Sequence, residues 1–334
     1  MSDTQGCLLV SGIRLSPDTD AAYAIAEARR RLRGVRLLSA GMHLEIYKKS
    51  VDARDARAVR LVYTVAARGK IPATLPAGLA GISMLSEEDP LPVIGGKPLS
   101  QRPVVVGSGP SGLFCALLLA ESGYRPVLIE RGGSVAERRA AYRRLITDGV
   151  LDTETNVQFG AGGAGTFSDG KLVTRTRDPL GSYILKTFVR FGAPEEILTL
   201  AKPHIGTDIL GTVVENMLAE ITRLGGEIHT HTRLLDLNVK GDTLVSVQTT
   251  RGEIPAGALV LAIGHSARDT YEMLLSHGFS IEPKAFSVGM RIEHLQADID
   301  KAMYGDYAGH PALGHAEYTL SSDTKTRGVY TFWR

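Results

Sequence analysis

Apolar and polar positions over the first third of the chain predict a small mixed domain. Residues 7–15 are mostly apolar, which is typical of a strand. Residues 16–32 predict a helix, with Ser16 or Asp18 as its N-terminal cap. Residues 44–67 predict two further strands joined by a charged turn. This β-α-β-β order indicates a small α+β domain.

The pattern changes further along the chain. Residues 75–103 are rich in proline and glycine and predict a linker. Residues 103–132 predict a strand, a tight turn, a helix and a second strand. Residues 207–226 predict a helix that ends at a glycine, and residues 227–264 predict several strands. The last of these, 258–264, is almost entirely apolar, which is typical of a strand buried on both faces.

The turn within residues 103–132 has the spacing G-x-G-x-x-G, with Gly107, Gly109 and Gly112. It follows an apolar strand and opens a helix at Pro110, the context of a dinucleotide-binding loop. The first glycine permits the turn, the second lets a pyrophosphate approach the backbone, and the third lets helix and strand pack closely. The helix N-terminus offers free N–H groups to phosphates. We therefore predict a dinucleotide site here.

The second strand ends at Glu130, where a carboxylate can accept hydrogen bonds from a ribose. An acid at this place disfavours a 2′-phosphate, so NADP is the least expected occupant. Residues 257–266 favour FAD over NAD, because an apolar strand there closes on Ala262 and Gly264 and is expected to return to the same sheet. The catalytic His or Tyr-x-x-x-Lys context of simple NAD dehydrogenases is absent from the sequence.

A second glycine-rich stretch lies within residues 158–178. Five small residues in a row, 160–164, precede Gly165. Such a run costs backbone entropy on folding, and the close approach of a flavin ring or a pyrophosphate to backbone N–H groups would explain it. Lys171 then lies where its charge would reach a phosphate or the flavin. The alternative is a flexible surface loop.

Composition and charge exclude classes of protein rather than name a partner. Among 334 residues, 38 basic and 36 acidic side chains nearly balance. Two distant cysteines, Cys7 and Cys115, predict neither a disulfide framework nor a dithiol centre, and Cys115 is expected to be a buried, inert thiol. The nine histidines show no metal-ligand spacing, so no metal is predicted. No signal-peptide pattern or membrane-spanning apolar stretch is present, which predicts a cytoplasmic protein.

Several motifs together resemble one family. Residues 107–132, 159–172, 204–210, 261–270 and 286–294 look like the bacterial uncharacterised FAD-dependent dehydrogenases, within the NAD(P)/FAD-dependent oxidoreductase superfamily. The resemblance implies an α/β fold: a Rossmann-like, glutathione-reductase-like FAD-binding domain with an inserted α+β domain. The small N-terminal α+β domain stands before it.

The resemblance implies that the chain has three parts. Residues 1–97 are the N-terminal domain with its linker, and residues 98–280 are the FAD-binding domain with its glycine-rich insertion. Residues 281–334 are the start of a second, substrate-binding domain. Family members continue past the motif GVYTF, whereas this chain ends at Arg334, so this domain is expected to be truncated and to lack the Gly-Asp pair that holds the ribityl chain.

The predicted cofactor-binding residues fall in four groups. The glycine loop and the end of the second strand are expected to hold the ADP half, the second glycine run and Lys171 are expected near the flavin, and the last strand forms part of the same site. The full set is Gly107, Gly109, Pro110, Ser111, Gly112, Glu130, Arg131, Gly162, Gly163, Ala164, Gly165, Thr166, Lys171, Ala262 and Gly264.

We predict an FAD-dependent oxidoreductase of unknown substrate, in which FAD takes a hydride or two electrons. NAD(P)H is expected only as a transient electron donor, because a second G-x-G-x-x-G is absent from the sequence. The expected partner is a small-molecule substrate or an electron donor or acceptor; no membrane and no nucleic acid is expected. No catalytic residue is assigned. Two alternatives stay open: a flavin-dependent RNA-modification factor, and a non-catalytic dinucleotide-binding fragment.

Overall fold

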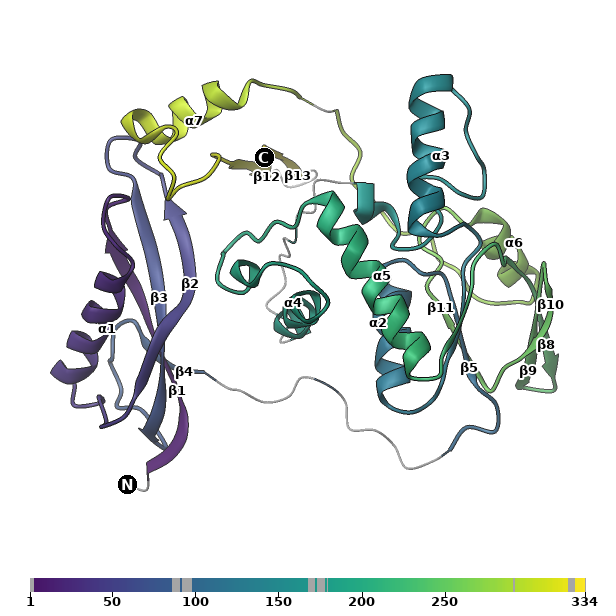
Figure 1. Cartoon of the computed structure of the whole chain (residues 1–334), viewed down its shortest axis with the longest axis horizontal. Helices are drawn as coiled ribbons and strands as arrows, with labels where there is room; N and C mark the ends of the chain where they lie inside the picture. The colour runs from purple at the N-terminus through teal and green to yellow at the C-terminus, as the bar shows by residue number, and fades with distance from the viewer. Residues whose placement is uncertain are drawn as a thin grey trace. The chain divides into compact units, whose positions relative to one another are not determined.

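The computed structural model divides the chain into two compact units (Figure 1). The first unit comprises residues 1–89, 198–202 and 286–334, and the second comprises residues 90–197 and 203–285. The structure describes residues 3–85, 91, 98–167, 172, 178, 180–290, 292–323 and 328–333. Within this part of the chain, no helix has both the length and the apolar character needed to cross a bilayer.

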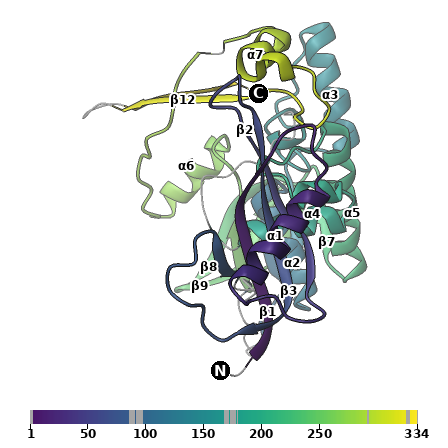
Figure 2. The ribbon, with the colours of Figure 1, turned by 90° about the vertical axis from the view of Figure 1, so that its left-hand side faces the viewer.

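The first unit is built on an antiparallel sheet in the order β2-β3-β1-β4. Its strands are β1 (Asp3–Leu15), β2 (His43–Asp52), β3 (Arg60–Pro72) and β4 (Ile82–Leu85). Helix α1 (Ala22–Gly34) covers one face of the sheet (Figure 2) and buries Ala24, Ala28 and Leu32 against it. The predicted β-α-β-β order is confirmed. Strand β4, however, lies inside the stretch predicted to be a linker, where it pairs with β1.

The first helix begins later than predicted. Ser16 and Asp18 do not cap it, because the Ser16 hydroxyl donates to the Asp18 carboxylate (3.1 Å) in the turn before the helix. The helix starts at Ala22, whose N–H donates to the Asp20 carboxylate at 2.7 Å. The short polar side chains therefore stabilise the turn, and the cap prediction was wrong.

The C-terminal stretch belongs to the first unit. It contains α7 (Gln296–Tyr304), a 3-10 turn (Gly305–Tyr307) and the hairpin of β12 (Tyr318–Asp323) and β13 (Gly328–Trp333). Tyr304, Leu313 and Ala316 are buried in the core of the antiparallel sheet. The boundaries predicted at residues 97 and 280 stay a prediction; the packing in the structure groups residues 286–334 with residues 1–89.

The second unit contains the parallel sheet expected of the α/β fold, in the order β11-β5-β6-β7. Its strands are β5 (Pro103–Val106), β6 (Val127–Ile129), β7 (Glu227–His229) and β11 (Ala258–Leu261). Its helices are α2 (Pro110–Glu121), α3 (Val135–Asp148), α4 (Leu180–Arg190), α5 (Thr207–Arg223) and α6 (Arg268–Ser276), with 3-10 turns at Ala164–Phe167 and Glu195–Leu198. An antiparallel sheet adds β8 (Leu234–Lys240), β9 (Thr243–Thr249) and β10 (Gly252–Pro255).

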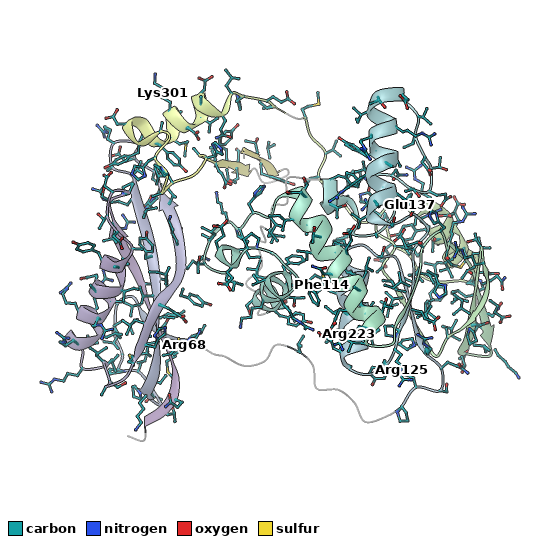
Figure 3. The ribbon with its side chains drawn as sticks, in the orientation of Figure 1. Arg68, Phe114, Arg125, Glu137, Arg223 and Lys301 are labelled. Atoms are coloured by element: carbon teal, nitrogen blue, oxygen red, sulfur yellow. The ribbon has the colours of Figure 1, made fainter. Side chains whose placement is uncertain are left out.

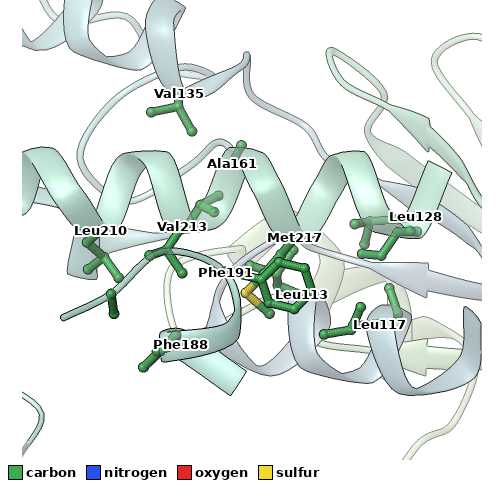
Figure 4. Close-up of a cluster of buried hydrophobic side chains, with 14 of the residues drawn as sticks. Leu113, Leu117, Leu128, Val135, Ala161, Phe188, Phe191, Leu210, Val213 and Met217 are labelled. Carbon is green, nitrogen blue, oxygen red and sulfur yellow. The ribbon is translucent and has the colours of Figure 1, made fainter. Parts of the chain in front are cut away.

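Two cores sandwich the parallel sheet. On one face α2 and α5 pack together, with Leu113, Leu117 and Met217 buried between them (Figure 4). Phe114, labelled in Figure 3, meets Phe188 of α4 edge to face at 5.4 Å between ring centroids. On the other face, β5 and β6 pack against β8, β9 and α6 through an aliphatic cluster. This layering confirms the predicted α/β class.

Strand β11 differs from its prediction in one respect. It returns to the sheet beside β5 in parallel register, as expected. Its residues are not buried on both faces: they are half-buried, and Leu261 is 36% exposed. The reason is that β11 lies at the edge of the sheet, and its last residue lines a cavity. An apolar run alone does not distinguish an edge strand from a central one.

Candidate dinucleotide-binding site

A cavity of about 400 Å³ lies at the carboxyl ends of β5, β6 and β11. This edge of a parallel sheet is where α/β proteins bind their ligands. Segments from five places in the sequence of the second unit line it: residues 106–111, 130–131, 158–164, 232–234 and 261–271. The cavity therefore brings together the first glycine loop, the end of the second strand and the end of the returning strand.

The three glycines of the first loop have different surroundings. Gly107 has a φ of +97°, and a Cβ on it would lie 2.4 Å from the Ala262 carbonyl oxygen. A Cβ on Gly112 would lie 1.8 Å from the Gly107 carbonyl oxygen, so only glycine allows this helix–strand contact. A Cβ on Gly109 would meet nothing within 4 Å. Gly109 therefore faces open space in the cavity, while its two neighbours pack against protein.

The amino end of α2 provides a site for an anion. Gly109 is the N-cap residue and Pro110 is the first helical residue, as predicted. Among the residues that the structure describes, no side chain caps this end, so the first backbone N–H groups of the helix have no side-chain acceptor there. Unpaired N–H groups and the positive end of the helix dipole favour a phosphate at this place. The geometry fits the pyrophosphate of a dinucleotide.

Glu130 is almost completely buried at the wall of the cavity. One carboxylate oxygen accepts hydrogen bonds from the backbone N–H (2.8 Å) and hydroxyl (2.9 Å) of Ser108. The other accepts from the N–H groups of Gly132 and Gly160, both at 2.9 Å. The carboxylate thus joins three loops, a role that the sequence did not indicate. The ribose contact predicted for Glu130 stays a prediction.

The second glycine run packs against protein. Gly160, Gly162 and Gly163 all have positive φ. A Cβ on Gly160 would lie 2.2 Å from Cδ of Arg138, and one on Gly163 would lie 3.2 Å from Cα of Gly109. The N–H of Gly162 also donates to the Ser108 carbonyl at 2.8 Å. The run is therefore an ordered loop that lies directly on the first glycine loop, which rules out the flexible-loop alternative for these residues.

The cavity gathers most of the predicted residues. Those that line it are Gly107, Gly109, Pro110, Ser111, Glu130, Arg131, Gly163, Ala164, Ala262 and Gly264. Those that do not line it are Gly112, Gly162, Gly165 and Thr166. Lys171 lies outside the residues that the structure describes. Thr166 is buried and hydrogen-bonded to Arg138, so its position serves the loop itself.

Four charged side chains form a network at the rim. Arg131 pairs with Glu154 and Asp269, both at 2.9 Å, and its guanidinium lies 4.4 Å from the centre of the Phe159 ring. Arg233 pairs with the same two carboxylates, at 3.2 and 3.6 Å. Burial opposes the charge of Arg131, but its bonds to Asp269 and Glu154 outweigh burial and raise its pKa. Because both carboxylates neutralise it, Arg131 is poorly placed to take up a phosphate charge.

Several residues that line the cavity lie outside the predicted set, namely Phe159, Thr232, His265, Ser266 and Tyr271. Of these, His265 follows the last predicted strand directly, and the sequence allows it a contact with a cofactor or substrate, although it favours a hydrogen-bonded structural histidine. Ser266 was available in the same way, because a loop after the last strand of a parallel sheet ends at the ligand edge. The others come from segments whose approach depends on the tertiary fold.

Neither cysteine has the environment of a reactive thiol. Burial raises the pKa of Cys7 and of Cys115, which keeps both protonated at neutral pH. Both are free. Among the described residues, no cluster of three or more His, Cys, Asp or Glu side chains has a metal-binding arrangement.

The comparisons with known proteins identify the family. Residues 101–281, more than half of the chain, match the pyridine nucleotide-disulphide oxidoreductase family. The chain belongs to this family. Residues 285–333 match a second family, described as FAD-dependent protein, C-terminal domain-like. The predicted oxidoreductase family is thereby confirmed, and the second match supports FAD as the cofactor; the cavity lies wholly within the matched residues 101–281.

One curated relative is an uncharacterized protein of Clostridium beijerinckii, 43% identical over 294 residues. The match covers 86% of this oxidoreductase and 55% of the relative, so the chain spans about half of the relative's length. Two solved structures are similar over part of the chain. Thermovibrio ammonificans THI4 is 17% identical with a TM-score of 0.37, covering 54% of this chain and 63% of that one. Glycine oxidase of Bacillus cereus is 14% identical with a TM-score of 0.36, covering 53% and 58%. At these TM-scores neither likeness bears on function.

Proposed function

We propose that this oxidoreductase holds the ADP half of FAD in the cavity at the end of β5, β6 and β11. The observation that carries the proposal is the open space at Gly109. This glycine lies at the amino end of α2, in a cavity bounded by Glu130 and Gly264. A loop that leaves room for an atom at its central glycine, beside free N–H groups, suits a pyrophosphate.

The chain's own residues would then have distinct tasks. The N–H groups at the start of α2 bind the pyrophosphate, and Glu130 lies where a ribose hydroxyl would approach. Gly163 and Ala164 form the wall on the side of the second glycine run. His265 and Ser266, which hydrogen-bond each other at 2.6 Å, border the cavity after Gly264.

FAD, when bound, would supply the capacity to accept a hydride or two electrons from a small molecule. The substrate would be a small organic molecule, and NAD(P)H would be a transient electron donor without a second dinucleotide loop. The residues around the cavity would orient the cofactor and exclude water from it. Burial raises the pKa of both cysteine thiols, so we assign no covalent step to them.

A visible absorption spectrum of the purified chain, before and after addition of FAD, tests the proposal. We expect the two bands of a protein-bound flavin, one FAD per chain on release by denaturation, and bleaching by a reductant under anaerobic conditions. A chain that stays colourless and takes up no added FAD would overturn the proposed site. Bound FAD that no electron donor or substrate reduces enzymatically would instead favour the non-catalytic alternative.

A further inference from the structure

Arg138 of α3 is fully buried, yet no carboxylate of the described residues lies within 4.0 Å of its guanidinium. A buried charge without a counter-ion is costly unless hydrogen bonds satisfy it. Burial lowers the pKa of Arg138 to about 10, which the more distant charge of Glu130 opposes. Burying the charged Arg138 side chain therefore costs free energy of folding, which suggests that this arginine has a specific structural role.

Within the part of the chain that the structure describes, the hydrogen bonds of this guanidinium all go to one segment, residues 156–166. Its three nitrogens donate to four backbone carbonyls and to one hydroxyl: Asn156 O (3.1 Å), Val157 O (2.8 Å), Phe159 O (2.9 Å), Ala161 O (2.6 Å) and Thr166 Oγ1 (2.8 Å). The guanidinium also lies 4.7 Å from the centre of the Phe167 ring. Arg138 therefore supplies donors to backbone carbonyls of residues 156–161, which belong to no helix or strand and precede the 3-10 turn at Ala164–Phe167.

One peptide group connects Arg138 to Glu130. The carbonyl of Phe159 accepts from Nε of Arg138, while the N–H of Gly160, in the same peptide unit, donates to the Glu130 carboxylate. The dipole of this peptide lies between a buried cation and a buried anion, an arrangement that strengthens both hydrogen bonds. The glycine at 160 is required because any Cβ there would overlap the Arg138 side chain.

We infer that Arg138 is a positioning residue for the dinucleotide site, acting through the loop 156–166. This inference rests on the proposed function for its relevance to FAD. The loop supplies Phe159, Gly160 and Gly163 to the cavity wall and lies against Gly109. Arg138 does not line the cavity itself. Its removal leaves the carbonyls of Asn156, Val157 and Ala161 without a donor from the described residues, and the Phe159 carbonyl keeps only the N–H of Asn156 at 3.2 Å, so the wall loses its fixed position.

Two substitutions separate this task from general stability. Arg138→Met keeps most of the apolar side chain and removes every donor, and Arg138→Lys keeps the charge but replaces the planar five-donor fork by one ammonium. Arg143→Met is the matched control, because Arg143 is exposed on the same helix. Ile221→Val is a second control that removes a methylene from the buried core of the unit without touching the loop.

Two readouts are needed. Amide hydrogen exchange of residues 156–166 is measured without added FAD, and the Kd for FAD is measured by quenching of flavin fluorescence. We expect Arg138→Met to remove exchange protection in this loop while β5 and β6 stay protected, and to raise the Kd at least tenfold. The loop protection and the Kd of Arg138→Lys should lie between those of Arg138→Met and the wild type. Both controls should keep the loop protection and the Kd of the wild type.

The outcomes distinguish the two proposals. A wild-type chain that binds no FAD would overturn the proposed function, whereas loss of loop protection in Arg138→Met would still support the loop-fixing role of Arg138. Unchanged loop protection in Arg138→Met, or an unchanged Kd with a wild type that binds FAD, would overturn the inference. If Arg138→Met unfolds as a whole, Arg138→Lys decides by the same readouts. A loss of protection in Arg138→Lys that is equal in the loop and in β5 and β6 would also overturn the inference.

Discussion

The two glycine-rich loops of the second unit look alike in sequence but differ in what their glycines accommodate. In the loop 107–112, the central glycine leaves space open toward the cavity. In the loop 160–165, Gly160 and Gly162 leave space that other parts of the protein fill, namely the side chains of Arg138 and Thr166. Glycine content therefore does not by itself indicate a ligand. What matters is whether the missing Cβ would meet protein or open space.

The largest effect is expected for Gly160→Ala. The residue has a φ of +111°, and the added Cβ would lie 2.2 Å from the buried Arg138 side chain. We expect a loss of about 3 kcal/mol in the free energy of unfolding, measured by urea titration. Gly181→Ala is the matched control, because Gly181 is in the first turn of α4 with open space around it, and should be neutral or stabilising. Equal stability of the two variants would contradict the packing argument.

Glu130→Gln tests the junction between the two loops. Glutamine keeps the shape of the side chain but replaces one acceptor oxygen by an NH2 donor. That NH2 then faces backbone N–H donors of Ser108, or of Gly132 and Gly160, from which the carboxylate oxygen accepted. We expect a loss of about 2 kcal/mol in stability, measured on the chain without added FAD. If Glu130 served only to bind a ribose, the urea midpoint of this variant would equal that of the wild type, and only its affinity for FAD would differ.

Gly109→Val tests the glycine whose missing Cβ leaves open space, in contrast to Gly160. Gly109 has an extended backbone (φ −67°, ψ 179°), which valine adopts readily, and no atom of the described residues lies within 4 Å of its Cβ position. We expect unchanged stability and a Kd for FAD raised at least about tenfold, or about 1.4 kcal/mol, since the side chain fills the space of the pyrophosphate. The Kd comes from flavin fluorescence. Wild-type affinity in this variant would place the dinucleotide elsewhere.

The smallest effect concerns the start of α3, which carries Arg138. The Ser134 and Glu137 side chains form a capping box there; Glu137 is labelled in Figure 3. The backbone N–H and then the hydroxyl of Ser134, with His231, lower the pKa of Glu137 to about 2. We expect Ser134→Ala to cost about 1 kcal/mol at neutral pH.

The pH dependence of the same variant gives a second check. A carboxyl whose folded pKa is lowered stabilises the fold above its ordinary value of 4.5, and this stabilisation is lost as the pH falls from there toward 2. Ser134→Ala removes one of the donors, so its stability should fall less than that of the wild type over this range. Urea midpoints at pH 7, 4 and 3 test this. Parallel pH profiles would show that the hydroxyl does not affect the Glu137 carboxylate.

Local pattern carried much of the fold prediction. Apolar runs and glycine spacing locate the strand–turn–helix–strand of residues 103–130, and α2 begins at Pro110 as predicted. Local sequence patterns gave the wrong prediction where contact with another segment or side chain determines the structure. Strand β4 forms in a proline- and glycine-rich stretch because β1 offers it an edge. Ser16 and Asp18 bond each other instead of a helix terminus.

The sequence by itself determined the local structure of the first glycine loop, because a turn, a helix start and the strand before it lie within a few residues of one another. Only the tertiary structure decided what the second run does. Its neighbours Arg138, Glu130 and Gly109 approach it from separate elements, and hydrogen bonding between them depends on how those elements pack. An arginine within the basic stretch 137–144 gives no local sign of burial, since burial is a property of the packed unit and not of the residue type.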